Sequence, residues 1–246
     1  MEKKMSSEMY DWIEKSIEEY YHFVKVLKKD DKKEIVLYQH KESGKTVIVK
    51  RLKHKSNVYE KMATIEHPNV VKVLEASSND ECTIVVEEYL DGISVADLLE
   101  NQSISSKMAY QIILQVCDGL EILHENEIVH RDIKPENVFI LEDESVKIID
   151  FDASRIYRKY EKKDTVVLGT VGYAPPEQYG EAQTDARSDI YALGVLMNVL
   201  FTGKHPVNEV ANGKIGNIIE KCIMVNQNKR YSNVSEIKGQ LKKLTY

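Results

Sequence analysis

Two short motifs contain the residues best suited to chemistry. Residues 130–137 read His-Arg-Asp-Ile-Lys-Pro-Glu-Asn, and Asp150-Phe151-Asp152 follows, with Asp150 eighteen residues after Asp132. The Asp132 carboxylate can accept a proton from a hydroxyl group. Asn137 and Asp150 provide the oxygen ligands that Mg²⁺ prefers. These residue types at this spacing are typical of a phosphoryl-transfer centre, which depends on a positioned base and bound metal more than on covalent chemistry.

The segment between the motifs predicts a β-hairpin that would position them. Residues 138–141 and 146–149 are short apolar runs, and a polar Glu-Asp-Glu-Ser tetrapeptide separates them. Because a hairpin brings its ends together, Asn137 at the entrance and Asp150 at the exit would share one small volume with Asp132. Lone Asp and Asn residues usually cap turns, but the spacing of these three favours the catalytic interpretation.

Further motifs occur in order along the chain. They are Val47-Ile48-Val49-Lys50, His130-Arg131-Asp132, Asp150-Phe151-Asp152, Ala174-Pro175-Pro176-Glu177 and Ser188-Asp189-Ile190-Tyr191-Ala192-Leu193-Gly194, followed by Arg230. Together they resemble the eukaryotic-type (Hanks-type) serine/threonine protein kinases, from about Phe23 to the C-terminus, and in particular short soluble kinases of Gram-positive bacteria.

The resemblance implies an α+β fold with two lobes around a cleft. The small lobe, residues 23–90, would be an antiparallel β-sheet with one regulatory helix, and the large lobe, residues 91–246, would be mainly helical. Residues 1–22 are expected to form a helical extension that begins at Ser6 or Ser7 and packs on the small lobe. Its apolar face would contain Met9, Ile13, Ile17 and Tyr20.

The resemblance also assigns the catalytic residues. Asp132 would orient and deprotonate the attacking hydroxyl, and Thr170 would bond to Asp132 and Lys134. Lys134 matches the version of the loop that acts on serine and threonine. Asn137 and Asp150 would hold Mg²⁺, with Mn²⁺ as an alternative.

ATP is the cofactor that the resemblance implies. Lys50 would hold its α and β phosphates, and a glutamate from a short helix at residues 57–65 would pair with Lys50. Glu88-Tyr89-Leu90 resembles the hinge whose backbone binds adenine, which puts Glu87 at the gatekeeper position. The full expected set of ATP-binding residues is Lys50, Glu60, Glu88, Leu90, Ile35 and Phe139.

Two departures from the family pattern leave a second interpretation open. The glycine positions of the phosphate-covering loop fall on Lys28, Asp30 and Lys33, so this run is either a solvated turn or a place where lysine side chains replace backbone amides. Asp152 replaces the glycine usual after Asp-Phe, which should reduce flexibility there. The chain is thus predicted to be an active Mg-ATP-dependent kinase acting on protein Ser/Thr or on itself. The alternative is a kinase-like interaction module with weak or no nucleotide binding.

Other residues are expected to support or regulate the site. Glu177 and Arg230 should form a buried ion pair, and residues 190–200 a buried helix capped by Ser188 and ended by Gly203. A phosphate on Thr165 could pair with Arg131, although a constitutively ordered loop is an equal alternative. The substrate-docking helix of the family is expected to be trimmed between Gly203 and residue 214.

Composition limits the partners. The net charge of −6 argues against nucleic acid and acidic membranes, and no stretch is apolar for long enough to span a bilayer. Cys82, Cys117 and Cys222 are predicted to be reduced, which indicates the cytoplasm. Because no signal pattern precedes the charged start and no apolar stretch could span a bilayer, the protein is expected to be soluble and complete. A protein substrate is expected; its identity and the oligomeric state stay open.

Overall fold

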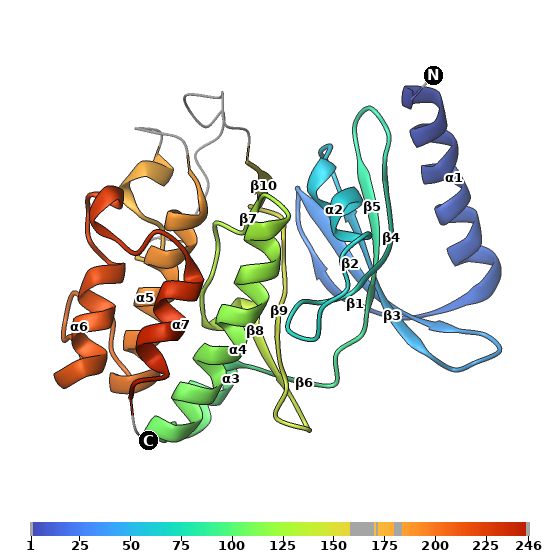
Figure 1. Ribbon diagram of the computed structural model, residues 1–246. Coiled ribbons are helices and arrows are strands. Elements are labelled where there is room, and N and C mark those ends of the chain that lie inside the picture. Colours follow the sequence, from blue (N-terminus) through green and yellow to red (C-terminus); the bar gives the residue numbers. More distant parts are fainter. Residues whose placement is uncertain (1, 158–169, 171, 180–183, 245–246) are drawn as a thin grey trace. The chain divides into compact units, whose positions relative to one another are not determined.

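The computed structural model describes residues 2–157, 170, 172–179 and 184–244, and the chain divides into two compact units. The small unit comprises Met1–His67 and Val71–Asp91, and the large unit comprises Pro68–Val70 and Gly92–Tyr246. The small unit is built on an antiparallel sheet and the large unit is mainly helical (Figure 1). The predicted α+β fold class is therefore confirmed. Among the described residues, no helix combines the length and the apolar character needed to cross a membrane.

The sheet of the small unit has five antiparallel strands in the order β1-β2-β3-β5-β4. Strand pairing fixes the register, so that Lys50 on β3 lies opposite Ile35 on β2 and Val85 on β5. Because successive side chains of a strand point to opposite faces, Lys50 lies on one face of the sheet and Val49 and Arg51 on the other. The strands are β1 (Tyr21–Lys29), β2 (Lys33–His40), β3 (Thr46–Leu52), β4 (Val73–Ser78) and β5 (Thr83–Glu88).

Helix α1 (Glu2–Tyr20) covers one face of this sheet, where it packs against β4 and β5 (Figure 1). Ile13 and Ile17 are buried in a cluster that also contains Val47, Val49, Ile84 and Val86. Met9 and Tyr20 were expected on the same buried face but are exposed, since the cluster is centred on the middle of the helix. The helix also begins before Ser6, so neither Ser6 nor Ser7 caps it; good helix formers precede them.

An ion pair fixes α1 to the sheet. The carboxylate oxygens of Glu14 accept bonds from Arg51 Nε (2.8 Å) and Nη2 (2.7 Å). This two-point geometry is stronger and more directional than a single contact. Since Arg51 follows Lys50 directly on β3, α1 stabilises the strand that carries the predicted nucleotide lysine.

Truncation of Ile13 should therefore destabilise the small unit. Ile13→Ala removes a fully buried side chain from the α1 cluster, and such changes typically lower the free energy of unfolding by about 2–5 kcal/mol. Trp12→Ala is the control, because the neighbouring Trp12 side chain is 52% exposed and should lose about 1 kcal/mol or less. Urea denaturation of the full chain measures both. Equal losses would contradict the packing of α1 on the sheet.

On the other face of the sheet lies α2 (Asn57–Met62), which contacts β4. It has six residues and is shorter than the predicted helix at 57–65, because the chain turns at residues 63–64. Tyr59 and Met62 are completely buried.

The large unit combines helices with two small sheets, in the orders β6-β8-β9 and β10-β7. Helix α5 is buried nearly all round and packs on α4 and α6. The helices are α3 (Val95–Asn101), α4 (Ser106–Glu125), α5 (Ala186–Thr202), α6 (Gly213–Cys222) and α7 (Val234–Leu241), with short turns η1 (Pro135–Asn137), η2 (Pro176–Tyr179) and η3 (Gln227–Lys229). The strands are β6 (Gly92–Ser94), β7 (Ile128–Val129), β8 (Val138–Leu141), β9 (Val146–Ile148) and β10 (Arg155–Ile156).

The ends of α5 agree with the sequence prediction at one terminus only. Gly203 ends the helix with a φ of 70°, a left-handed conformation that glycine adopts without strain. The N-cap is Asp185 instead of Ser188, since the Asp185 side chain accepts the backbone N–H of Arg187. The Ser188 hydroxyl donates to Glu177 Oε1 (3.0 Å). Residues 203–212 contain no helix, in agreement with the trimmed docking region.

Candidate active site

The backbone of the catalytic loop is shaped by Asp189 of α5. Its completely buried carboxylate accepts the N–H groups of His130 (2.8 Å) and Arg131 (2.7 Å) and bonds His124 Nε2 (2.8 Å). Burial alone would raise the pKa of Asp189, but the hydrogen bond and charge of His124 hold the pKa below its ordinary value. An ionised Asp189 can therefore hold Arg131 at a φ of 70°, a left-handed conformation that is strained for a residue other than glycine.

The sequence prediction missed the role of Asp189. The signal was a charged residue in an otherwise apolar helix, because buried charges are rare unless they are paired. A second missed residue is Gln178, whose side-chain amide donates to the carbonyl of Arg131 (2.6 Å). Both residues position the loop and are far from it in sequence.

All four predicted catalytic side chains are brought together in the large unit. Thr170 Oγ1 donates to Asp132 Oδ1 (2.6 Å), and Lys134 Nζ contacts both Thr170 Oγ1 (2.7 Å) and Asp132 Oδ2 (2.8 Å). Asn137 Nδ2 donates to Asp132 Oδ2 (2.9 Å). A carboxylate has about four lone-pair sites, and these contacts use three. Among the described residues, these contacts leave one lone-pair site on Oδ1.

The predicted hairpin brings the two candidate metal ligands close to each other. Strands β8 and β9 pair in antiparallel register, and the N–H of Ile149 donates to the carbonyl of Asn137 (3.0 Å). The next residue, Asp150, has a φ of 64°. The φ of Asp152 is not positive. This replacement of the family glycine therefore introduces no left-handed strain.

His130 and Phe151 have packing roles. Their rings are in edge-to-face contact, with centroids 5.0 Å apart, and His130 Nε2 bonds the carbonyl of Ile149 (3.1 Å). Burial lowers the pKa of His130, which keeps the imidazole neutral at pH 7. These contacts agree with the packing role expected for His130.

Lys50 pairs with Glu87 instead of with Glu60. Lys50 Nζ lies 3.0 Å from Glu87 Oε1 and 2.9 Å from Oε2. The carboxylate of Glu60 accepts the backbone N–H of Ser78 (3.1 Å). The predicted pairing of Glu60 with Lys50 is thus corrected: the short helix α2 directs this carboxylate to the start of the β4–β5 turn.

Three of the remaining predicted ATP-binding residues lie on strands β2, β5 and β8, and Leu90 lies in the segment after β5. Ile35 on β2 is opposite Lys50, and Glu88 ends β5, where its N–H donates to the carbonyl of Lys72 (3.0 Å). Leu90 follows β5 within the small unit, whereas Phe139 is on β8 of the large unit. Their contact with adenine stays a prediction.

The segment without glycines forms a tight turn between β1 and β2. Asp30 Oδ1 accepts the backbone N–H groups of Lys32 (2.8 Å) and Lys33 (2.9 Å). These bonds lower the pKa of Asp30 and stabilise its charged form. The amides that could approach a phosphate are therefore already bonded to a carboxylate of the chain itself.

A buried ion pair lies behind the site. Arg230 Nη1 and Nη2 donate to the two carboxylate oxygens of Glu177 (2.6 and 2.9 Å), which confirms the predicted pair.

Arg131 remains a cation at pH 7, although burial and the like charge of Arg155 lower its pKa to about 10. Thr165, the expected phosphorylation site opposite Arg131, lies outside the described residues.

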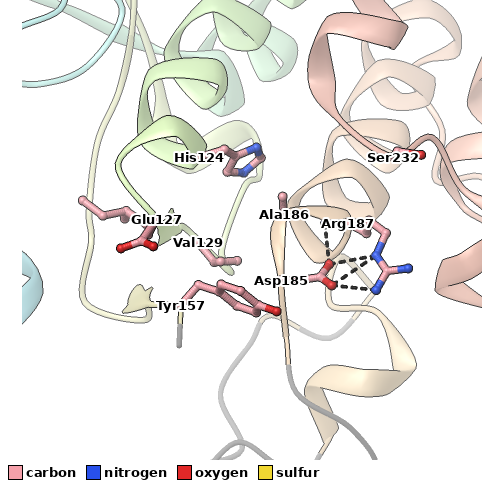
Figure 2. Close-up of a pocket in the computed structure, with 9 residues that line it drawn as sticks. His124, Glu127, Val129, Tyr157, Asp185, Ala186, Arg187 and Ser232 are labelled. Carbon is pink, nitrogen blue, oxygen red and sulfur yellow. Dashed lines mark hydrogen bonds and ion pairs between the residues drawn. The ribbon is translucent and has the colours of Figure 1, made fainter. Parts of the chain in front are cut away.

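A separate cavity of about 250 Å³ lies in the large unit next to α5 (Figure 2). His124, Tyr157 and Arg187 line it, together with Asp185. The Arg187 guanidinium bonds the Asp185 carboxylate (2.6 Å from Nη2) and Asn228 Oδ1 (2.6 Å from Nη1). These bonds connect the start of α5 to the η3 turn, which contains Asn228.

Comparison with known proteins agrees with this geometry. A model of the protein kinase domain family matches residues 21–245. A probable serine/threonine-protein kinase of Clostridium perfringens is 31% identical over 222 residues, which cover 80% of this chain and 32% of that protein. Serine/threonine-protein kinase PknB of Mycobacterium tuberculosis is 30% identical over 210 residues, covering 73% of this chain and 34% of PknB. The chain thus spans about a third of the length of these curated relatives. The match over residues 21–245, together with the bonded set around Asp132, shows that the chain belongs to the protein kinase domain family.

Proposed function

We propose that the chain transfers the γ-phosphate of Mg-ATP to serine or threonine side chains, of a protein substrate or of itself. The observation that carries this proposal is the bonded set of Asp132, Lys134, Asn137 and Thr170. A positioned carboxylate beside a cation is the arrangement that orients a hydroxyl and stabilises the charge of the transferring phosphoryl group. The serine/threonine class is supported by Lys134 and by the names of the relatives.

Each residue of the set has a distinct task in this proposal. Asp132 accepts the hydroxyl proton through the remaining site on Oδ1, and Thr170 and Asn137 fix the rotamer of its side chain. Lys134, 2.8 Å from Asp132 Oδ2, places a positive charge where the transferring phosphoryl group gains negative charge. Lys50 of the small unit would bind the α and β phosphates.

Asn137 and Asp150 fit a magnesium ion. The amide nitrogen of Asn137 is committed to Asp132, which leaves Oδ1 as its ligand atom, and the Asp150 carboxylate would be the second ligand. Mg²⁺ is usually bound by one or two carboxylates together with substrate phosphates and water, and no group of three or more His, Cys, Asp or Glu able to hold a metal occurs among the described residues. When bound, the ion would neutralise charge on the phosphate oxygens.

The competing function is an interaction module that binds little or no nucleotide. The turn at Asp30 favours it, because a carboxylate occupies the amides that would face the phosphates. The set around Asp132 opposes it, since a chain without catalysis has no chemical reason to keep these residues bonded in this way. A small-molecule kinase is a third candidate, but Lys134, the pair of Glu177 with Arg230 and the full activation segment argue against it, since these parts build a platform for a protein substrate.

A transfer assay tests the proposal. Purified chain is incubated with γ-labelled ATP and Mg²⁺ or Mn²⁺, with and without a generic basic protein, and the labelled amino acid is identified after hydrolysis. We expect phosphoserine or phosphothreonine on the chain or on the added protein. Absence of labelled protein with either metal, combined with no detectable nucleotide binding, would replace the enzyme with the interaction module.

The turn at residues 28–33 gives a matched pair of variants. Lys28 lies opposite Ile35, which lies opposite Lys50, so these three share one face of the sheet. Lys29 is in the neighbouring row, and its Nζ is bonded to Glu34 Oε1 (2.6 Å). Lys28→Ala should therefore weaken ATP binding by about two- to fivefold, the value of one exposed charge contact, and leave adenosine binding unchanged.

Lys29→Ala is the control and should affect ATP binding less than Lys28→Ala does. Calorimetric titration of both ligands at low and high salt measures the difference, because an exposed contact is screened by salt. If ATP affinity is the same in wild type and both variants, the lysines belong to a solvated turn.

The three cysteines bear on where the chain works. Cys82, Cys117 and Cys222 are free thiols, and burial raises the pKa of Cys117 and Cys222 so that both stay protonated. Unreactive free thiols suit a reducing compartment. On this basis the cytoplasm is our proposed location for the domain.

A further inference from the structure

The ion pair between Lys50 and Glu87 is built into the sheet. Ile48 lies opposite Glu87 and Lys50 lies opposite Val85, so Lys50 and Glu87 are diagonal neighbours on the same face of adjacent strands β3 and β5. Their side chains are only 7% and 4% exposed. Both carboxylate oxygens of Glu87 lie within 3.0 Å of the ammonium group.

Helix α2 contributes a ring to this pair. The Tyr59 ring lies with its centroid 5.6 Å from Lys50 Nζ, and this side chain is completely buried. The carboxylate of the same helix, Glu60, bonds the backbone of Ser78. The described contacts thus place a carboxylate from the sheet, and an aromatic face from the helix, against the ammonium.

We propose that Glu87 is the positioning residue for Lys50, so that the sheet itself holds the nucleotide lysine in place. This inference rests on the proposed phosphoryl transfer and adds a residue to it. Strand register is fixed by backbone hydrogen bonds, so the backbones of Lys50 and Glu87 on β3 and β5 keep their spacing unless the sheet opens. A partner on a helix, in contrast, moves whenever the helix moves. The carboxylate that holds Lys50 therefore belongs to the sheet, and α2 adds only the ring contact of Tyr59.

The contact with Glu87 has an alternative interpretation, in which it hinders ATP binding by Lys50, and this is also testable. Glu87 could withdraw the ammonium from the phosphates, and its removal would then improve ATP binding. The two effects predict changes of opposite sign in the KM for ATP, so one series of variants separates them.

The experiment compares Glu87→Gln with Glu60→Gln in steady-state kinetics of γ-phosphate transfer, well below the melting transition of each variant. Glu87→Gln keeps the size of the side chain and removes its charge. We expect its kcat/KM for ATP to fall by about tenfold or more, with a raised KM, and the loss in Glu60→Gln to be smaller. Glu87→Asp keeps the charge and should recover part of kcat/KM; it also decides the question if Glu87→Gln does not fold.

Three results would overturn the proposal. They are an unchanged kcat/KM in Glu87→Gln, a lowered KM for ATP in that variant, and a larger loss in Glu60→Gln than in Glu87→Gln. A merely structural role would lower the melting temperature of Glu87→Gln while leaving kcat and KM per folded molecule unchanged, which is the first of these results.

Chemical labelling keeps the test separate from the proposed function. If the wild-type chain transfers no phosphate, the function fails, and acetylation of Lys50 by acetic anhydride, followed by mass spectrometry, still reports on its partner. Acetylation should be faster in Glu87→Gln than in wild type and in Glu60→Gln. Equal rates in all three proteins would exclude Glu87 as the group that holds Lys50.

Discussion

Asp132→Asn is expected to lower the turnover number for phosphoryl transfer by about 10²- to 10⁴-fold, the usual contribution of a positioned base. The substitution keeps the size of the side chain and an oxygen that can accept the Thr170 hydroxyl, which is bonded to Asp132 Oδ1 in the structure. It removes the negative charge that accepts the hydroxyl proton. ATP binding should therefore stay nearly intact. Single-turnover measurements with saturating ATP separate this effect from binding.

Asp143→Asn is the matched control for Asp132→Asn. Asp143 lies in the turn of the β8–β9 hairpin, is exposed, and accepts the backbone N–H of Ser145. Its amide variant removes the same charge at an exposed turn of the same unit, and activity should stay close to that of wild type. Equal turnover in wild type and Asp132→Asn would exclude Asp132 as the base.

Asp150→Asn should weaken the Mg²⁺-dependent binding of ATP, whereas Asp132→Asn should lower turnover. Without this carboxylate, the candidate metal site retains the amide oxygen of Asn137, which binds Mg²⁺ more weakly than a charged ligand does. Titration of ATP with and without Mg²⁺ should show tighter binding with the metal in wild type and little difference in Asp150→Asn. If Mg²⁺ tightens ATP binding equally in wild type and Asp150→Asn, Asp150 is not the main metal ligand.

Local patterns in the sequence were sufficient to predict the hairpin and the residues at its ends. Two apolar runs separated by four polar residues can pair in only a few ways, and the observed pairing of Val138 with Ile148 places Asn137 next to Ile149. The predicted cluster of Asn137 and Asp132 followed from that short-range geometry. Gly203 was likewise predictable, because the end of a helix is a local event.

Contacts that depend on packing could not be predicted in the same way. The partner of Lys50 is 37 residues away and is selected by the register of β3 on β5, which no local pattern fixes. Asp189 binds the loop at Arg131 from 58 residues away, across the interior of the large unit. Asp185 and Ser188 are both residue types that cap helices, and they stand three positions apart. Asp185 is the N-cap of α5, because the Ser188 hydroxyl donates its hydrogen bond to Glu177.

Arg230→Ala should have the largest effect on stability. The guanidinium is completely buried, donates to both oxygens of Glu177, and also bonds the carbonyls of Met224 (2.7 Å) and Arg187 (2.9 Å). Removal of one partner of a buried pair strands the other charge and typically costs about 3–5 kcal/mol. For a chain of this size, the melting temperature of the large unit should fall by roughly 6–20 °C.

Lys204→Ala is the control for Arg230→Ala, because Lys204 and Glu209 form an ion pair of the same length (2.6 Å) whose side chains are 58% and 47% exposed. Its loss should change the free energy of unfolding by about 1 kcal/mol or less. Thermal melts of wild type, Arg230→Ala and Lys204→Ala therefore compare a buried and an exposed ion pair of the same length. Equal melting temperatures for Arg230→Ala and Lys204→Ala would show that the Glu177 pair contributes no more than a surface contact.

The Arg230 variant should also lose activity before it unfolds. Glu177 is followed directly by Gln178, whose side chain holds the carbonyl of Arg131 in the catalytic loop (2.6 Å). When Arg230 is removed, the charge of Glu177 has to reach solvent, and the η2 turn that carries both residues must shift. We therefore expect turnover in Arg230→Ala to decline at temperatures below its melting transition. Parallel loss of turnover and of folded protein would instead mean that the pair supports only global stability.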